Sequence, residues 1–390
     1  MRIKVLIVSL IIALICMSTM AQTPLTFVGV REAAMGGAYV AIADDINALH
    51  TNPAGLIQID GFHLNMLTVQ MNAGTDIFSK IDQIQGMGDK DQETQTEELG
   101  DLIPLKLGFD IFGPLPLVTY TGSAPGFLKA LGSNMGFGGF ARGRMRGSLV
   151  RPTLPTVVLE ANADAALMVG FAKEYKKGLI PVDTAIGYSL KYISRVQTSE
   201  FRQSATQILN GEDVGAAGYS SVTGIGLDLG ALFTSDIPYV GKSKVGLVVQ
   251  NLGATVTGKE YDVSGNVTND NFSEEIPVTV KAGLAWTTDL NLSWPLISGL
   301  LNGTTTFAAD YDIAMPNASF WKRLHFGAEK RVLGNIVALR TGLNQGYITC
   351  GLGVNWFIFN MDYAYYVEEM GNEIGVDPYD YHIIEVGMAF

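Results

Sequence analysis

The feature that most constrains the fold is an alternation of side-chain type with a period of two residues, which runs from residue 62 to the C-terminus. In the segment 304–313, for example, Phe307 and Tyr311 lie on one face and Asp310 and Asp312 on the other. A soluble β-sandwich would pair an apolar core face with a water-exposed face rich in lysine and glutamate. Here one face is aromatic and aliphatic, whereas the other is small and polar with a few charges. This pattern is typical of a membrane β-barrel, in which the apolar face meets lipid and the polar face lines a wet, crowded lumen.

The alternation divides the chain into fourteen candidate strands, an even number as in bacterial single-chain barrels. They are expected at 62–72, 105–119, 134–146, 162–174, 181–196, 218–234, 243–253, 277–289, 303–315, 322–331, 335–344, 347–357, 358–367 and 381–390. The sequence therefore predicts an all-β fold, a transmembrane antiparallel β-barrel.

The connections between these strands alternate in length. Those expected to be long and polar are 73–104, 147–161, 197–217, 254–276 and 368–380, and those expected to be short are 175–180, 235–242 and 332–334. Long loops on one side and short turns on the other are typical of an outer-membrane barrel, with both chain ends on the short-turn, periplasmic side. Segments 120–133 and 290–302 fall on the short side but are long and partly apolar, so small helices or turns are expected there.

Composition agrees with a barrel rather than with a helical membrane protein. Charged residues make up only 16% of the chain and mean hydropathy is +0.22, yet after the first 20 residues the chain has no apolar block of the ~18 residues that a membrane helix needs. Glycine is abundant, at 45 residues. The net charge of −12 argues against binding to nucleic acid, because phosphate contacts require a basic surface.

The N-terminus has the pattern of a secretory signal peptide. Arg2 and Lys4 precede an apolar run over 5–17, and the small residue Ala21 follows. Cleavage after Ala21 is expected, with lipoprotein cleavage before Cys16 as the alternative. The mature chain would then carry 24 basic and 38 acidic residues, and Cys350 would be its only cysteine.

The alternation also predicts which charged residues line the lumen, because every second residue of a strand, those of one parity, points inward. These are Lys191, Asp228, Lys281, Asp310, His325, Glu329, Arg340, Asp362 and Glu385. Charges of both signs on neighbouring strands are expected to form cross-strand pairs. We expect each to pair and to be solvated in the lumen rather than to contact a substrate.

Residues 22–61 do not read as strands and are expected to form a compact plug ahead of the barrel, which would occupy 62–390. Asp44 is expected to cap a short helix that Pro53 ends. Gly36 and Gly37 permit a turn or close backbone packing. The pair Asp44 and Asp45 is expected to be a cap and plug contact rather than a catalytic pair.

The N-terminal segment also resembles a known family. Met35-Gly36-Gly37-Ala38, Ala43-Asp44-Asp45 and Asn52-Pro53-Ala54-Gly55 resemble the signature of the FadL-type long-chain fatty-acid transporters, and more closely the related PorV/PorQ-like outer-membrane proteins. The segments Gly226–Gly230, Asn251–Gly253, His325–Glu329 and Leu339–Leu343 resemble the latter group too. The resemblance implies a fourteen-stranded barrel closed by an N-terminal hatch, with Gly36, Gly37, Asp44, Asp45, Asn52, Pro53 and Ala54 in the hatch.

Sequence motifs for an enzyme are absent. The four histidines are scattered, with no metal-ligand spacing, and neither a nucleophile elbow nor a P-loop occurs. No metal or cofactor is expected. The acidic stretch 82–101 lacks an EF-hand pattern and is expected to be a solvated loop.

The first functional hypothesis is passive uptake of hydrophobic small molecules, such as long-chain fatty acids, through an outer-membrane channel in contact with lipid. A ligand would enter among the long loops, and movement of the hatch would release it. The second hypothesis is a PorV-like component of type IX secretion that binds secreted proteins. A general porin is the third, and a plug argues against it.

Overall fold

The structure is a computed structural model that describes residues 25, 27–59, 62–76, 80, 83, 86–87, 90–103, 105–151, 153–176, 182–199, 201–210, 217–237, 241–290, 302–315 and 318–389. The expected signal peptide, 1–21, lies outside these residues. Within the described part, no helix is long and apolar enough to cross a membrane.

Fourteen antiparallel strands of the described chain close into a barrel. They are β1 (Phe62–Gly74), β2 (Leu105–Ser123), β3 (Asn134–Val150), β4 (Thr156–Tyr175), β5 (Asp183–Thr198), β7 (Tyr219–Ile237), β8 (Gly241–Tyr261), β10 (Thr279–Leu290), β11 (Gly303–Asp312), β12 (Leu324–Val332), β13 (Val337–Asn344), β14 (Tyr347–Trp356), β15 (Phe359–Glu369) and β16 (Pro378–Ala389). Each pairs with its neighbour along the chain, β16 pairs with β1, and β8 pairs with β10. The expected fourteen-stranded transmembrane barrel is confirmed.

The outer face of the barrel is apolar, as the alternation predicts. Ile225, Leu284 and Ile348 are exposed on it, with exposed fractions of 58%, 59% and 70%. Residues of the opposite parity on the same strands, such as Asp228 and Ala285, are buried inside. The alternation therefore marks a lipid-facing outer surface and a packed interior.

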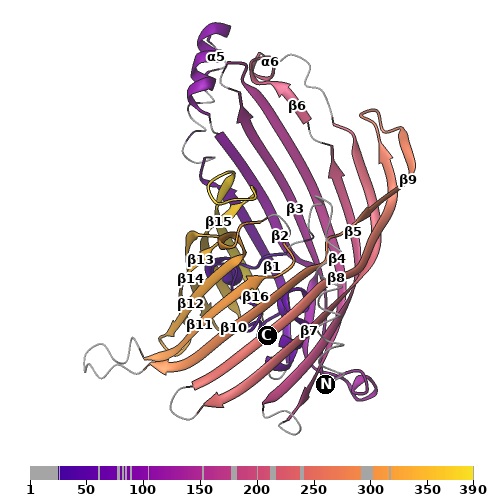
Figure 1. Ribbon diagram of the computed structural model, residues 1–390, viewed down its shortest axis with the longest axis vertical. Coiled ribbons are helices and arrows are strands. Elements are labelled where there is room, and N and C mark those ends of the chain that lie inside the picture. The colour runs from indigo at the N-terminus through magenta and orange to yellow at the C-terminus, as the bar shows by residue number, and fades with distance from the viewer. Residues whose placement is uncertain are drawn as a thin grey trace.

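The two walls of the barrel differ in height (Figure 1). Strands β2–β5, β7 and β8 have 16 to 21 residues, whereas β1 and β10–β16 have 8 to 13. About 9–11 residues of tilted strand cross a bilayer, so the tall wall extends well beyond the membrane. We call the end of the barrel with this extension the loop end, and the opposite end, near the C-terminus, the turn end.

Additional short helices and strands lie at the loop end. The hairpin strand β9 (Val267–Glu275) pairs with the upper half of β8, and β6 (Phe201–Ser204) pairs with the start of β4. Helices α5 (Gln92–Asp101) and α6 (Ala205–Leu209) lie at the top of the tall wall in Figure 1. The 3-10 helix η3 (Trp321–Arg323) lies in the β11–β12 connection at this end, whereas η2 (Gly126–Leu128) lies in the β2–β3 connection at the turn end.

Three expectations about connections are corrected here. The loop expected at 147–161 shrinks to 151–155 because β3 and β4 continue into it, and 254–276 is mostly the β8–β9 hairpin. Outside the bilayer neither face of a strand meets lipid, so the alternation that reveals membrane strands disappears. The acidic stretch 82–101 contains α5, whose Leu99 packs with Leu105 and Leu149 rather than remaining a solvated loop. The expected small helix in 120–133 is present as η2, whereas 291–301 lie outside the described residues.

Candidate functional site

Residues 27–59, which we call the plug segment, pack inside the barrel against its inner wall. The segment contains α2 (Val30–Ala34), α3 (Ala48–Thr51) and η1 (Pro53–Gln58). Helix α2 contacts β13–β16, and η1 contacts β3–β5 and β7, so the plug segment reaches opposite sides of the wall. Met35, Tyr39 and Leu49 have no exposed surface.

Glycines on the inner wall form the surface on which the plug segment rests. A Cβ on Gly246 would lie 2.9 Å from the Val40 carbonyl oxygen, and one on Gly136 2.8 Å from Leu49 Cδ2. The other wall glycines where a Cβ would meet the plug segment are Gly170, Gly187, Gly230, Gly283, Gly327, Gly342 and Gly351. The high glycine content thus lets the plug segment lie directly against the strand backbones.

The Gly36-Gly37 and Asn52-Pro53 motifs of the plug segment are explained by the local backbone conformation. Gly36 and Gly37 have φ of +66° and +81° and make a turn that favours glycine. The Asn52 side chain donates to the Val40 carbonyl (2.9 Å) and accepts from the Ala54 amide (3.1 Å), which ties two parts of the segment together. Pro53 opens η1, and Asn52 is extended, with φ −154°, so α3 ends there as expected.

Asp44 does not cap a helix, contrary to expectation. The residue at the N-terminus of α3 is Asn47, which makes no side-chain cap, and Asp45 Oδ1 accepts from the Asn47 amide at 2.9 Å instead. Asp44 forms an ion pair with Arg31. Arg31 carries a full positive charge, whereas the N-terminus of a helix carries a partial charge of roughly +0.5.

Arg31 joins the plug segment to the wall. Its Nε and Nη2 each lie 2.9 Å from a carboxylate oxygen of Glu329 on β12, and its Nη1 donates to the Tyr39 hydroxyl at 2.9 Å. Glu329 also accepts from Arg331 Nε (2.9 Å) and Arg340 Nε (2.8 Å). Arg340 in turn pairs with Asp362. This arginine–carboxylate network spans α2, β12, β13 and β15.

A second set of contacts between the plug segment and the wall lies along β10–β13. Asp310 Oδ2 accepts from the backbone amides of Tyr39 (2.7 Å) and Val40 (2.8 Å). His325 Nδ1 lies 3.0 Å from the Gly36 carbonyl oxygen, and its Nε2 lies 3.4 Å from Asp312. Lys281 also lies 3.4 Å from Asp312. One wall carboxylate, that of Asp310, and the imidazole of His325 therefore bind the plug segment through its backbone.

The remaining residues selected by parity have other partners. Lys191 Nζ lies 2.7 Å from Asp228 and 2.6 Å from the side-chain oxygen of Asn251. Asp228 also accepts from the Asn251 amide at 2.8 Å, at a bulge where Asn251 has φ +62°. These three residues join β5, β7 and β8, and Lys191 lines a small cavity together with Glu32 and His50 of the plug segment. Glu385 is half-buried beside Arg340 and Asp362 in the cavity described next.

A cavity of about 330 Å³ lies at the turn-end side of the plug segment. Its charged lining residues are Arg31, Asp44, Asp45, Arg331, Arg340, Asp362 and Glu385. The cavity thus brings the Asp44–Asp45 pair together with several of the lumen residues named from parity.

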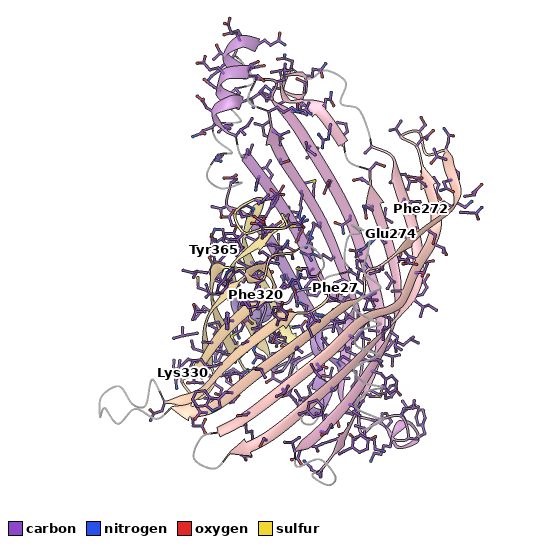
Figure 2. The ribbon with its side chains drawn as sticks, viewed as in Figure 1. Phe27, Phe272, Glu274, Phe320, Lys330 and Tyr365 are labelled. Carbon is purple, nitrogen blue, oxygen red and sulfur yellow. The ribbon has the colours of Figure 1, made fainter. Side chains whose placement is uncertain are left out.

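The inner wall is not uniformly polar, which the alternation did not predict. Inner residues of β4, β5, β7 and β8 form a continuous apolar strip toward the loop end: Ala166, Met168, Ile193, Val222, Ala254 and Val256. The strip belongs to one apolar cluster with Leu25 and Phe27. Phe27 packs with Phe112 and Phe140 at ring distances of 5.6 and 5.9 Å, and Phe27 is labelled near the middle of the barrel in Figure 2.

Several inner-wall charges were missed from the sequence. Arg142 and Arg144 both pair with Asp110, and Arg146 lies 3.0 Å from Glu368. Arg195 pairs with Asp164 at 2.7 Å and with Glu274 of β9 at 3.4 Å. The i, i+2, i+4 spacing of the three β3 arginines is a parity signal that could have revealed them.

Comparison with known proteins gives distant structural likenesses. The Pseudomonas putida toluene transporter TodX has 12% identity and a TM-score of 0.45, and the CymD monoaromatic hydrocarbon channel 13% and 0.45. The Ralstonia pickettii toluene transporter TbuX has 13% identity and a TM-score of 0.42. Each comparison covers 93% of this chain and 97% of the other.

No protein-family model matches the chain, and no curated protein matches it significantly. With TM-scores below 0.5, the structural likenesses do not bear on what this chain binds. The fold that the sequence resemblance implies, a fourteen-stranded barrel with an N-terminal segment inside it, is the fold observed.

Proposed function

We propose that this protein is a passive outer-membrane channel for hydrophobic small molecules, such as long-chain fatty acids. The observation that carries the proposal is the apolar strip on the inner wall. A water-filled pore has a polar lumen, whereas here Ile193, Val222 and Val256 at inward-facing positions belong to a buried apolar cluster. Burial of each CH₂ group of a ligand on such a strip contributes about 0.8 kcal/mol. Long aliphatic chains are therefore favoured over small polar solutes.

The proposed route begins at the loop end, which faces the cell exterior. A ligand follows the apolar strip down to Phe27, Phe112 and Phe140, where the plug segment blocks the lumen. Release toward the turn end, on the periplasmic side, requires the plug segment to shift. Gly36, Gly37, Asn52, Pro53 and Ala54 are the backbone positions at which we propose that this shift occurs, with Asp44 and Asp45 held by Arg31 in the closed state.

Uptake of radiolabelled oleate tests the proposal. Cells lacking the protein are compared with cells that carry it or the variant V222D, which places a charge on the apolar strip. We expect uptake to depend on the protein and to fall at least fivefold in V222D, with V267D on the exposed face of β9 as the matched control. Equal uptake in the presence and absence of the protein overturns the proposal.

A second candidate function is a PorV-like binding platform for secreted proteins. The observation that favours it is the tall wall, which carries α5, α6, β6 and β9 beyond the membrane on one side (Figure 1). The test is purification of the full chain from its native membrane, with mass spectrometry of stoichiometric partners. Deletion of β9 (267–275) would abolish recovery of a secreted protein on this hypothesis, whereas the channel hypothesis predicts no stoichiometric protein partner in the first place.

A further inference from the structure

A second cavity, of about 240 Å³, lies between the plug segment and the turn end of the wall. Wall residues that line it are Lys242 and Lys244 of β8, Thr287 of β10, Thr304 and Thr306 of β11, and Arg331 of β12. The plug segment contributes Arg31 and Asp44. Register places these wall residues together, because β8, β10, β11 and β12 are consecutive partners in the barrel. Lys330, which precedes Arg331, marks this end of β12 in Figure 2.

The charge of this cavity is unlike that of the whole chain. Four cations and one carboxylate, Asp44, line the cavity, whereas the chain has a net charge of −12. Among the described residues, no ion pair is formed by Lys242 or Lys244. Lys244 donates to the neutral side chain of Gln58 instead. Neither lysine therefore has a carboxylate of the described residues in direct contact, and Asp44 acts on Lys244 only from beyond ion-pair distance.

The carboxylates nearest these lysines are engaged or differently placed. Glu329 accepts from Arg31 and Arg331, and Asp44 pairs with Arg31. Asp289 accepts from the Thr304 hydroxyl at 3.0 Å. Asp236 is opposite Lys242 in the β7–β8 register without forming an ion pair. The contact ion pairs of these carboxylates are thus with the arginines and not with the two lysines.

Ammonium, guanidinium and hydroxyl groups converging on one space are donors suited to an oxyanion. Thr287 and Thr306 lie within hydrogen-bond distance of each other, at 3.2 Å between hydroxyl oxygens, so at least one oxygen is free to orient its proton elsewhere. The volume is several times the ~30 Å³ that a water molecule occupies in the liquid. A phosphate or carboxylate group with its first waters fits such a space.

We propose that this cavity is an oxyanion site, in which Lys242, Lys244 and Arg331 bind a phosphate or carboxylate group. Its walls come from both the plug segment and the barrel, so a bound anion connects the two. Occupancy then stabilises the plug segment in its closed position, independently of which molecule the barrel transports.

The experiment uses the full mature chain folded in zwitterionic detergent. Isothermal titration calorimetry measures binding of inorganic phosphate, and separately of acetate, to wild type, to K242Q and to K242Q/K244Q. K259Q is the matched control, since Lys259 lies on the same strand but pairs with Asp270 at the loop end. Heat-modifiable migration in gels verifies that each variant forms the barrel.

We expect one saturable site in the wild type, weakened at least threefold in K242Q and at least tenfold in the double variant, and unchanged within twofold in K259Q. Preference for phosphate or for acetate identifies the oxyanion class. The absence of saturable binding of either anion to wild type overturns the proposal, as does equal affinity in wild type and the folded K242Q variant. K242Q retains the Lys244 contact to Gln58, so a folding defect of the double variant does not decide the outcome.

Discussion

Arg31 and Glu329, 298 residues apart in the chain, form a two-point ion pair, with Nε and Nη2 of Arg31 each 2.9 Å from a Glu329 oxygen. The Glu329 side chain is 1% exposed. It is the only carboxylate of the described residues that bonds Arg31, Arg331 and Arg340 together. This pair therefore couples the position of the plug segment to that of β12.

The first prediction concerns this pair. Glu329→Gln leaves three arginines close together with one fewer counter-charge, and breaking a buried pair costs about 3–5 kcal/mol. We expect the plug segment to loosen and single-channel openings in planar bilayers to become at least ten times more frequent. Asp270→Asn, which breaks an exposed pair with Lys259, is the control and should behave as wild type. Silent recordings from both variants would contradict the assignment.

A second prediction follows from the two backbone amides held by Asp310. Asp310→Ala removes the acceptor for the Tyr39 and Val40 amides, whereas Asp310→Asn keeps an oxygen in the same place. Hydrogen exchange measured by mass spectrometry should be at least tenfold faster across 37–43 in the alanine variant, with the asparagine variant intermediate. Identical exchange in all three proteins would show that Asp310 does not hold the segment.

The glycine surface leads to a third prediction. Gly327→Val places a side chain against Met35, and overpacking of this kind costs about 1–3 kcal/mol. Valine is otherwise the better strand residue, so only contact with the plug segment makes this substitution harmful. Gly143→Val, at a position with no atom within 4 Å of a new Cβ, is the control. Urea unfolding should show lower stability for Gly327→Val alone.

The fourth prediction addresses the loop end. Asp91 caps α5 by accepting from the Thr94 amide at 3.0 Å and the Thr94 hydroxyl at 2.7 Å, and these bonds lower the pKa of Asp91. The capping contribution is therefore present above the unfolded pKa of about 3.9 and is lost as pH falls through the lower folded value. Asp91→Ala should reduce the hydrogen-exchange protection of α5 at pH 7. In the wild type this protection should fall on acidification, whereas in Asp91→Ala it should not change with pH. Thr96→Ala is the control, and unchanged protection in Asp91→Ala would exclude the cap.

Much of the barrel could be predicted because the side chains of each strand alternate according to whether they face lipid or the barrel interior. The apolar positions of β11, such as Phe307, and the polar ones, such as Asp310, follow from alternation without knowledge of any neighbour. The same parity places His325 and Arg340 inside. It does not work where water surrounds the chain, so β9 and the ends of β3 and β4 were expected to be loops.

The sequence by itself determined the strand number, the inward and outward faces, and a non-strand segment ahead of the barrel, because these depend on side-chain periodicity along one strand at a time. Only the tertiary structure decided that Arg31 meets Glu329, that Asp44 pairs with Arg31 instead of capping a helix, and that Val222 and Val256 form an apolar strip with Ile193. These contacts join segments that closure of the barrel brings together, and a pattern read along the chain carries no information on which distant residues will meet.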